Sequence, residues 1–307
     1  MKRISWCATA TVCFFMSSAP ARAWWPQGHS LISEASVRAL PADVPLFFRR
    51  NAGQVAHCAQ DPDLFKNPAL PQVTDNEAPD HFIDWELLQG RALPPTRAEF
   101  VKLCARLKVD PQRVGFAPYA IAEWTQRLTI AFAEHRKYPG DTNVQNKIGV
   151  YAGILSHYSA DLCMPLHATI DYDGRAKAGG VSPKSGIHAR IDSLPERLNL
   201  SPQALSQGQS VQAISDLMTG ITSEIERSRT QINAAYQLEN QLPPESEAEA
   251  RQWKPAVQIR EWGTGRAREA TRFTASLFLT AWRDSARVKL PSWLRRERTK
   301  AASSSTR

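Results

Sequence analysis

The stretch "NVQNKIGVYAGILSHYSADL", residues 143–162, is long and strongly apolar, and its pattern predicts an α-helix. It carries His157 and Asp161, which a helix places on one side, one turn apart. An imidazole and a carboxylate in this arrangement can reach one metal ion. Pro165 in the following "CMPLH" ends the helix, so His167 approaches from a different direction. The segment therefore predicts both a central helix and part of a metal site.

Helical periodicity recurs along the chain, whereas the alternation typical of strands is nearly absent. The other predicted helices cover residues 29–40, 118–137, 187–198, 210–237 and 256–288. The proline-rich segments 70–80 and 238–250 have the length of loops rather than of linkers between domains. We therefore predict an all-α fold with a single multi-helix domain at residues 24–290, followed by a basic, disordered tail at residues 291–307.

The first 23 residues have the composition of a secretory signal peptide. Lys2 and Arg3 precede the apolar run "ISWCATATVCFFM", and "SSAPARA" ends with a small-residue cleavage pattern at Ala23. The run is too short for a membrane span, and no later stretch approaches the ~20 apolar residues that one needs. These features predict a secreted or periplasmic protein that begins at Trp24 after processing. We expect it to be monomeric, without a transmembrane segment.

The formal charge of +8 is concentrated at the two ends of the chain. Residues 1–23 contribute +3 and residues 283–307 contribute +6, which leaves −1 for residues 24–282. A basic tail can hold an acidic surface such as nucleic acid or anionic lipid, and equally it can be a solubilising end. The near-neutral body gives nucleic acid little electrostatic attraction.

Three cysteines follow the predicted signal peptide: Cys58, Cys104 and Cys163. An odd number in an exported chain allows one disulfide, for which Cys58–Cys104 is the more favourable pair, although spacing does not establish it. There is no C-x-x-C pair that would indicate a cysteine-bound zinc ion. Helical phase turns Cys163 away from His157 and Asp161, which predicts a packed thiol.

Two further stretches offer histidines with nearby carboxylates. "GIHARID" repeats the His-x3-Asp spacing with His188 and Asp192 on a predicted helix. "APDHFIDWE" offers His81, and Asp84 and Glu86 behind it are candidate hydrogen-bond acceptors that orient the imidazole. A second independent His-x3-Asp pair is harder to dismiss as a coincidence than the first pair alone.

Two more stretches complete the set of candidate ligands. "AQDPDLFK" offers Asp61 and Asp63, and "WWPQGH" offers His29 near the expected start of the processed chain. Cleavage after Ala23 frees the α-amino group of Trp24, whose ordinary pKa of about 7.7–8.0 allows deprotonation beside a cation. The amine and the carbonyl oxygen of Trp24 can then chelate one ion, with His29 as a further ligand.

Together these motifs resemble the superfamily that contains secreted single-strand-specific zinc nucleases and bacterial zinc-dependent phospholipases C. In that family an N-terminal tryptophan, five histidines and three aspartates hold three zinc ions. "WWPQGH", "PDLFK", "HFID", "HYSADLCMPLH" and "HARID" are similar to its motifs, in the same order over residues 24–192. Each motif alone is weak, but the ordered set is specific. After residue 192 the sequence resembles the superfamily only in its helical character.

The resemblance implies a cleft with three Zn²⁺ ions per chain. The first ion would be held by Asp63, His81, His157 and Asp161, the second by Trp24, His29 and the bridging Asp161, and the third by His167, His188 and Asp192. Asp61 is the alternative to Asp63. We favour Asp63 because Lys66 then falls where the family carries a basic residue near the phosphate.

The resemblance also implies hydrolysis of phosphodiesters. A hydroxide held between two zinc ions would attack phosphorus, Asp63 and Asp161 would hold the ions, and Lys66 would stabilise the developing charge. A nuclease or nucleotidase acting on nucleic acid or nucleotides is preferred, because the Trp24–His29 spacing and the 21-residue step between His167 and His188 resemble that branch. The loop after His167 departs from the nuclease pattern, and the usual paired cysteines are missing, so base selectivity stays open.

Two alternatives remain. One is a phospholipase C that releases diacylglycerol from phospholipids. The other, of a different class, is a noncatalytic exported helical protein that binds zinc. Structural zinc sites are usually closed and rich in cysteine, so nine dispersed nitrogen and oxygen ligands argue against this last reading.

Overall fold

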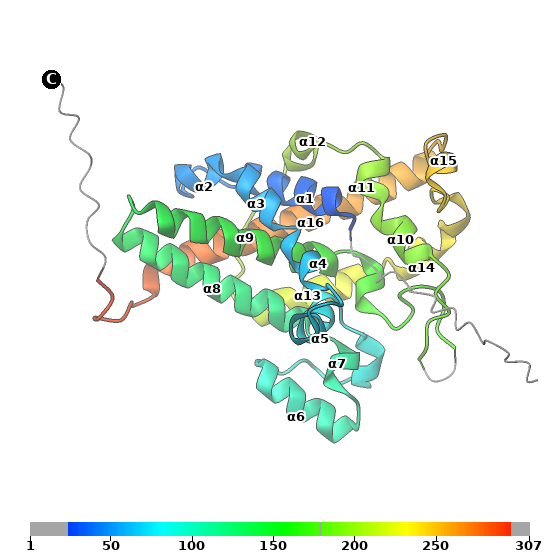
Figure 1. Cartoon of the computed structure of the whole chain (residues 1–307), viewed down its shortest axis with the longest axis horizontal. Helices are drawn as coiled ribbons and strands as arrows, with labels where there is room; N and C mark the ends of the chain where they lie inside the picture. The colour runs from blue at the N-terminus through cyan, green and yellow to red at the C-terminus, as the bar shows by residue number, and fades with distance from the viewer. Residues whose placement is uncertain (1–23, 178–179, 296–307) are drawn as a thin grey trace, which may run out of the picture.

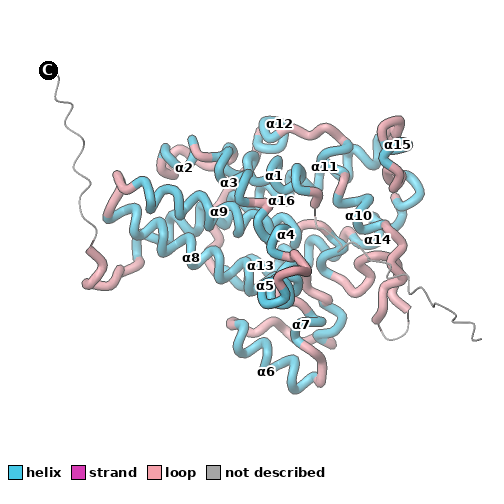
Figure 2. The backbone as a smooth tube through the Cα atoms, in the orientation of Figure 1, coloured by secondary structure: helices cyan, strands magenta, loops and turns pink. Residues whose placement is uncertain are grey.

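Four long helices form the centre of the molecule: α1 (Pro26–Arg38), α8 (Ala117–Lys137), α9 (Thr142–Leu162) and α16 (Val257–Asp284). The computed structural model describes residues 24–177 and 180–295. In Figure 1, α8, α9 and α16 run side by side, and each of them packs on the other two. Over the described residues there is no β-strand, only two isolated bridges, as Figure 2 shows. The predicted all-α fold is confirmed.

The other helices of the described chain surround this centre. They are α2 (Leu46–Arg50), α3 (Ala52–Cys58), α4 (Asp61–Phe65), α5 (Pro71–Glu77), α6 (Arg97–Leu107), α7 (Pro111–Val114), α10 (Ile187–Asp192), α11 (Leu194–Arg197), α12 (Pro202–Ser206), α13 (Leu217–Arg229), α14 (Ile232–Gln237) and α15 (Glu247–Ala250). Five 3-10 turns connect them: η1 (Ala78–His81), η2 (Trp85–Leu88), η3 (Pro165–Ala168), η4 (Glu239–Gln241) and η5 (Ser285–Arg287). In Figure 1, α6 projects from the lower side of the bundle.

One hydrophobic cluster joins these helices. At its centre the ring of Phe48 lies edge-on to the rings of Phe132 and Phe278, with centroid distances of 5.3 and 5.6 Å. Burying such a side chain stabilises the fold by roughly 1.5–3 kcal/mol. Near the middle of α9, Gly153 allows α3 to approach closely, because a Cβ at this position would lie 2.5 Å from the Cβ of Cys58. The packing of α3 on α9 matters for the metal centre described below.

The predicted helices at 29–40, 118–137, 143–162 and 256–288 correspond to α1, α8, α9 and α16, within a few residues at their ends. Two other predictions were wrong in extent. The helix predicted at 187–198 breaks at Ser193, because Pro195 occupies the first turn of α11. The helix predicted at 210–237 begins only at Leu217, where the side chain of Asp216 caps α13 by accepting from Thr219 N.

The three cysteines of the described chain are all free and buried thiols, so the disulfide that the sequence allowed, with Cys58–Cys104 as the more favourable pair, is not formed. Cys163 is packed as expected, and its Sγ donates to Glu224 Oε1 at 3.5 Å. None of the helices in residues 24–177 and 180–295 is long and apolar enough to cross a membrane. The predicted signal peptide and residues 296–307 of the predicted tail lie outside the described residues.

Candidate metal centre

The side chains predicted as ligands converge at the C-terminal end of α9. They come from six elements: α1 (His29), α4 (Asp63), η1 (His81), α9 (His157 and Asp161), η3 (His167) and α10 (His188 and Asp192). Seven of the eight residues are buried, and the side chain of the eighth, Asp63, is only 8% exposed. Their potential ligand atoms form three groups, in each of which these atoms lie within 4.8 Å of one another.

The first group contains Asp63, His81 and His157. His157 Nε2 lies 3.1 Å from His81 Nδ1 and 3.9 Å from Asp63 Oδ1. On the other side of the imidazole ring, His157 Nδ1 donates to Ala59 O at 2.7 Å. This hydrogen bond leaves the lone pair of Nε2 directed into the group. Ala59 directly follows α3, so the close packing of α3 on α9 orients this ring.

The second group contains His29, His157 and Asp161, and it shares His157 with the first. His29 Nε2 lies 3.2 Å from Asp161 Oδ1, and the His29 ring stacks on the His157 ring at 3.7 Å. The other carboxylate oxygen, Asp161 Oδ2, lies 3.0 Å from His81 Nδ1. The carboxylate of Asp161 therefore faces both groups, which is the position of a bridging ligand.

Trp24 lies next to this second group. Its side chain is fully buried, and its indole Nε1 donates to Ala160 O at 2.9 Å. The backbone N–H of Trp25 donates to Asp192 O at 3.2 Å. These two hydrogen bonds tie the start of the described chain to the residue before Asp161 and to the third group.

The third group contains His167, His188 and Asp192. His167 Nδ1 donates to His81 O at 2.8 Å, and His188 Nδ1 donates to Tyr172 O at 3.1 Å. With both Nδ1 atoms occupied by backbone carbonyls, the Nε2 atoms are left to face the carboxylate. His188 Nε2 lies 3.0 Å from Asp192 Oδ2.

The hydrogen-bond inventory tests whether these groups fit a metal. In the described part of the chain, fifteen buried side-chain nitrogen and oxygen atoms lack a hydrogen-bond partner. Ten of them belong to residues of the three groups: His29 Nδ1 and Nε2, both oxygens of Asp63, His81 Nε2, Asp161 Oδ1, His167 Nε2, His188 Nε2 and both oxygens of Asp192. Two of these atoms contact a charged side chain outside the groups: Asp63 Oδ1 lies near Lys66, and His81 Nε2 lies near Glu77. Unpartnered buried polar atoms are costly, so such a concentration needs an explanation. Convergent imidazole nitrogens and carboxylate oxygens are the donors that zinc binds, and the residues therefore fit this metal.

Burial sets the protonation of four of the five histidines in these groups. It lowers the pKa of His29 and His157 to about 4, and the pKa of His81 and His167 well below the ordinary value. Near neutral pH these four imidazoles are uncharged, and their lone pairs can bind a cation without first releasing a proton. Burial also raises the pKa of Asp161 well above its usual range, so its carboxylate form favours a neighbouring cation.

Asp63 is the aspartate of α4 that reaches the first group. Burial raises its pKa, but Lys66 and the imidazoles of His157 and His29, which are protonated in the acidic range where this carboxyl group titrates, outweigh this and lower it to about 2. Lys66 Nζ lies 2.5 Å from Asp63 Oδ1, and both side chains are 8% exposed. The alternative, Asp61, is only partly buried and belongs to none of the three groups. The structure thus brings Asp63, and not Asp61, to the predicted site.

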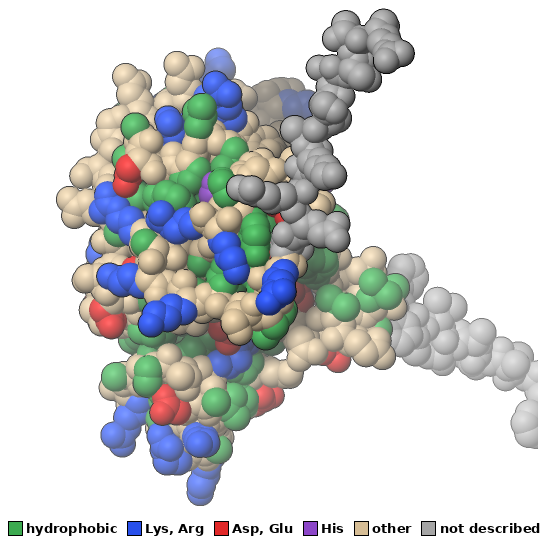
Figure 3. Space-filling model, turned by 90° about the vertical axis from the view of Figure 1, so that its left-hand side faces the viewer, with side chains coloured by type: hydrophobic (Ala, Val, Ile, Leu, Met, Phe, Trp, Pro, Cys, Tyr) green, Lys and Arg blue, Asp and Glu red, His purple; other side chains and the backbone are tan. Residues whose placement is uncertain are grey.

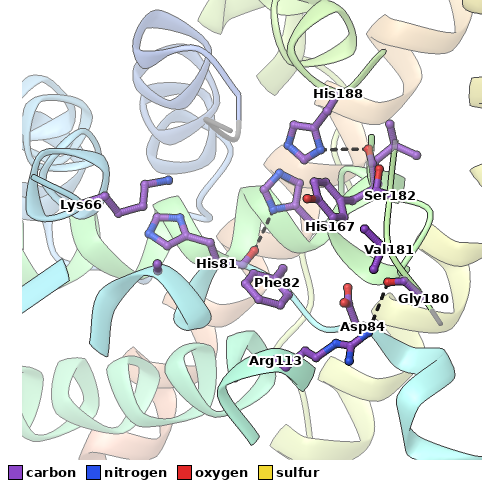
Figure 4. Close-up of a pocket in the computed structure, with 13 residues that line it drawn as sticks. Lys66, His81, Phe82, Asp84, Arg113, His167, Gly180, Val181, Ser182 and His188 are labelled. Carbon is purple, nitrogen blue, oxygen red and sulfur yellow. Dashed lines mark hydrogen bonds between the residues drawn. The ribbon is translucent and has the colours of Figure 1, made fainter. Parts of the chain in front are cut away.

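A cavity of about 460 Å³ opens beside the third group. Its lining includes Lys66, His81, Phe82, Asp84, Arg113, Leu166, His167, Tyr172, Val181, Ser182 and His188. Figure 4 shows Lys66 near His81 at one end of this cavity, and Asp84 beside Arg113 at the other. Burial and the charge of Glu86 raise the pKa of Asp84 to about 7. The cavity therefore combines apolar walls with charged groups at both ends.

A carboxylate that sequence reasoning missed contacts His81. Glu77 Oε1 lies 3.4 Å from His81 Nε2 and accepts from Tyr158 OH at 2.5 Å. Burial raises the pKa of Glu77 to about 7. The signal for this contact was present in the sequence, because Glu77 and His81 are four residues apart at the junction of α5 and η1.

The expectation that Asp84 and Glu86 orient His81 was wrong. Glu86 accepts from Thr169 Oγ1 and from Arg229, and Asp84 lines the far end of the cavity. The chain turns from η1 into η2 after His81, which directs the two carboxylates away from the imidazole. Glu77 takes the expected position instead.

No protein-family model matches the chain, and no curated protein matches it. Among solved structures, the chain is similar to "Alpha Toxin from Clostridium Absonum", with a TM-score of 0.50 and 12% sequence identity. The match covers 85% of this chain and 64% of the toxin chain, so this chain spans less than two thirds of that protein's length. At this level of identity the likeness concerns the fold of the matched part alone.

Proposed function

We propose that the chain is a zinc-dependent phosphodiester hydrolase that holds three Zn²⁺ ions per chain. The observation that carries the proposal is the set of unpartnered, buried imidazole and carboxylate atoms that meet at the end of α9. The motif order over residues 24–192 and the fold likeness to the alpha toxin support it. A trinuclear centre would explain why each of the three neighbouring groups contains buried nitrogen or oxygen atoms without a hydrogen-bond partner.

The proposed ligands follow the three groups. Asp63, His81, His157 and Asp161 would hold the first ion, the amine and carbonyl of Trp24 with His29 and Asp161 the second, and His167, His188 and Asp192 the third. The assignment of Asp161 to two ions rests on its two oxygens, which face His81 and His29. Export would complete the site, because the amine of Trp24 becomes a ligand only after cleavage at Ala23.

The chemistry divides between the metal and the chain. Bound zinc supplies a Lewis acid that lowers the pKa of a water molecule and polarises a phosphoryl oxygen. Ala59 O, His81 O and Tyr172 O fix the histidine rings so that no reorientation is needed during the reaction. Lys66, which lies at the cavity wall and keeps Asp63 ionised, would stabilise charge on the phosphate oxygens.

Nucleic acid or a nucleotide is the first candidate substrate. The cavity offers the ring of Phe82 for stacking on a base, and the polar side chains of Asp84 and Arg113 for its edge or for a second phosphate. A phospholipid is the second candidate, favoured by the apolar Leu166 and by Val181, which is 65% exposed. The superfamily that the motifs resemble contains enzymes of both kinds.

A substrate panel tests the proposal. The purified protein is incubated with single-stranded DNA, RNA, 3′-nucleotides and phosphatidylcholine vesicles, with and without a chelator. Release of mononucleotides or nucleosides that stops with chelator and returns with zinc is the expected result. Release of diacylglycerol would favour the phospholipase. The proposal of a zinc phosphodiesterase would be contradicted if the chelator did not change the turnover, or if the zinc-loaded protein turned over none of these substrates.

Two substitutions on α4 form a matched pair for this assay. Asp63→Asn removes a charge from the first group, whereas Asp61→Asn makes the same chemical change two residues away and outside every group. We expect Asp63→Asn to lower kcat/KM by at least about 100-fold, and Asp61→Asn to leave it within about twofold. Equal losses in both variants would show that the effect comes from the helix and not from the metal centre.

A further inference from the structure

The bundle has a basic end, where α8 finishes and α9 begins. Three segments meet there: residues 41–50, 134–147 and 282–295. The ring of Phe47 lies 4.3 Å from the ring of His135, and Lys137 Nζ donates to Leu294 O at 3.1 Å. Arg136 Nε donates to Ser285 Oγ at 2.7 Å. These contacts join the three segments into one surface, which we call the basic end face.

Cations outnumber anions on this face. It carries nine basic residues: Arg49, Arg50, Arg136, Lys137, Lys147, Arg283, Arg287, Lys289 and Arg295. Against them stand four acidic residues, so the face is +5, whereas the remaining described residues sum to −3. Figure 3, which views the molecule from this end, shows Lys and Arg side chains spread over the visible surface, with acidic side chains scattered among them.

The four acidic side chains of the face already have partners. Asp43 lies 3.6 Å from Arg283, Asp284 pairs with Arg287, and Glu134 pairs with Lys147. The carboxylate of Asp141 caps α9 by accepting from the backbone N–H groups of Asn143 and Val144. The excess positive charge is therefore available to an external anionic partner.

Apolar side chains are exposed among these cations. Trp293 is 77% exposed and Leu46 is 50% exposed. Exposed tryptophan and aliphatic side chains beside Lys and Arg are typical of proteins that bind membrane interfaces, where the ring lies at headgroup level and the cations contact phosphates. Nucleic acid would use the cations and the Trp293 ring, but an aliphatic side chain such as Leu46 offers no ring to stack on a base.

The face is separate from the metal centre. α9 has 21 residues and begins at the basic end, whereas its metal-binding side chains, His157 and Asp161, are in its last turns. At 1.5 Å per residue, these two residues lie roughly 22–28 Å along the helix axis from the first residue of α9. A partner bound at this face leaves the cavity accessible. The partner can therefore be identified without knowing which substrate the cavity binds.

We propose that the basic end face docks the protein on an anionic phospholipid membrane. Trp293 and Leu46 insert at headgroup level, and Arg287, Lys289 and Arg295 contact lipid phosphates. The sequence after Arg295, which lies outside the described residues, contains four further basic residues and one acidic residue. Docking by this face holds the candidate metal centre at the other end of α9, roughly 22–28 Å from the first residue of the helix.

Vesicle sedimentation tests the proposal. The zinc-loaded protein that begins at Trp24 is mixed with vesicles of phosphatidylcholine alone or with 30% phosphatidylglycerol. We expect at least tenfold tighter binding to the anionic vesicles, with the difference lost in 0.5 M salt because screening shortens the range of the attraction. Equal binding to both vesicles, or no binding to either, would overturn the proposal.

Matched variants locate the surface. The triple variant Arg287→Glu, Lys289→Glu and Arg295→Glu should lose at least tenfold in binding to anionic vesicles, and Trp293→Ala should lose a few-fold. The control, Arg91→Glu, Lys102→Glu and Arg106→Glu, makes the same charge change at exposed positions on and near α6 and should bind as the wild type does. Circular dichroism checks that each variant is folded. If the two triple variants bind alike, the basic end face is not the docking site.

A parallel titration with single-stranded DNA separates the other class of partner. One outcome would assign the face to nucleic acid and overturn the membrane proposal. In that outcome the protein binds DNA, the Arg287, Lys289 and Arg295 triple variant loses DNA binding, and the same variant binds vesicles as the wild type does. Hydrolysis is followed in the same samples. Because the face lies away from the cavity, kcat on soluble substrates should be the same in wild type and variants, whichever substrate the enzyme proves to use.

Discussion

Asp161 Oδ1 lies 3.2 Å from His29 Nε2, and the second oxygen of the same carboxylate faces His81. One side chain of α9 thus joins a proposed ligand from α1 to a proposed ligand from η1. A single buried carboxylate in this position makes the two groups interdependent, because a substitution that replaces one of its oxygens changes the potential ligands of both groups. The consequences can be measured as metal content.

Metal analysis of the purified protein should give three zinc ions per chain. Asp161→Asn should lower the count to one, because both ions of the bridged pair lose a ligand, whereas His188→Ala should lower it only to two. Inductively coupled plasma mass spectrometry on dialysed protein measures the counts. One zinc ion or none in the wild type, or an equal loss of zinc ions in the two variants, would contradict the proposed arrangement.

An additional residue before Trp24 should remove one ion. A processed chain with a single Gly before Trp24 converts the free amine into an amide, which is a poor ligand, while Trp24 keeps its burial and its bond to Ala160 O. We expect two zinc ions instead of three and a loss of most activity. The same chain with Trp24 as its first residue is the control. An extended protein with three ions and full activity would exclude the amine as a ligand.

Glu77→Gln should weaken zinc binding at the first group. Glu77 contacts His81 Nε2, and replacing a carboxylate that orients a metal-bound imidazole typically costs 10- to 100-fold in metal affinity. Competition with a chromophoric chelator measures this affinity without reference to activity. Glu86→Gln serves as the control, since Glu86 contacts Thr169 and Arg229. A Glu77→Gln protein with wild-type zinc affinity would leave this carboxylate with a packing role only.

Lys66→Met should reduce kcat by about 100- to 1,000-fold, the usual effect of removing one group that stabilises charge in the transition state. Lys66→Arg keeps the charge beside Asp63 and should recover part of the rate. Zinc content, measured on the same samples, should remain three per chain in Lys66→Arg. If Lys66→Met turns over substrate as fast as the wild type, the charge on the phosphate is stabilised elsewhere.

The sequence predicted the parts of the structure that depend on local pattern. Periodicity identified α1, α8, α9 and α16, and the His-x3-Asp spacing predicted that His157 and Asp161 would share a helix face. Contacts between segments that are distant in the sequence were harder to predict. Nothing near His157 indicates that Ala59, which is 98 residues away, supplies the carbonyl that orients its ring.

Glu77 was missed for a related reason. The motif drew attention to the carboxylates after His81, and only the turn from η1 into η2 reveals that they point elsewhere. Asp63 was preferred over Asp61 through the resemblance and not through geometry. In the structure the preference has a physical basis, because only Asp63 reaches His157 and Lys66.

Gly153→Ala should destabilise the fold, although alanine normally favours helices. A Cβ at residue 153 would lie 2.5 Å from Cys58 Cβ and 2.9 Å from Val55 O, so α3 must move away from α9. Overpacking of this kind costs roughly 1–3 kcal/mol, more than the roughly 0.5–1 kcal/mol that removing a helical glycine contributes.

Gly53→Ala is the matched control for this substitution. Gly53 lies in α3 itself and has no atom within 4 Å of an added Cβ, so alanine there should stabilise the protein by up to about 1 kcal/mol. Chemical denaturation of both variants gives the two changes, which should have opposite signs. Because Ala59 O follows α3 and orients His157, Gly153→Ala should also weaken zinc binding, and Gly53→Ala should not. A stable Gly153→Ala protein with unchanged zinc affinity would mean that the packing of α3 does not position this ligand.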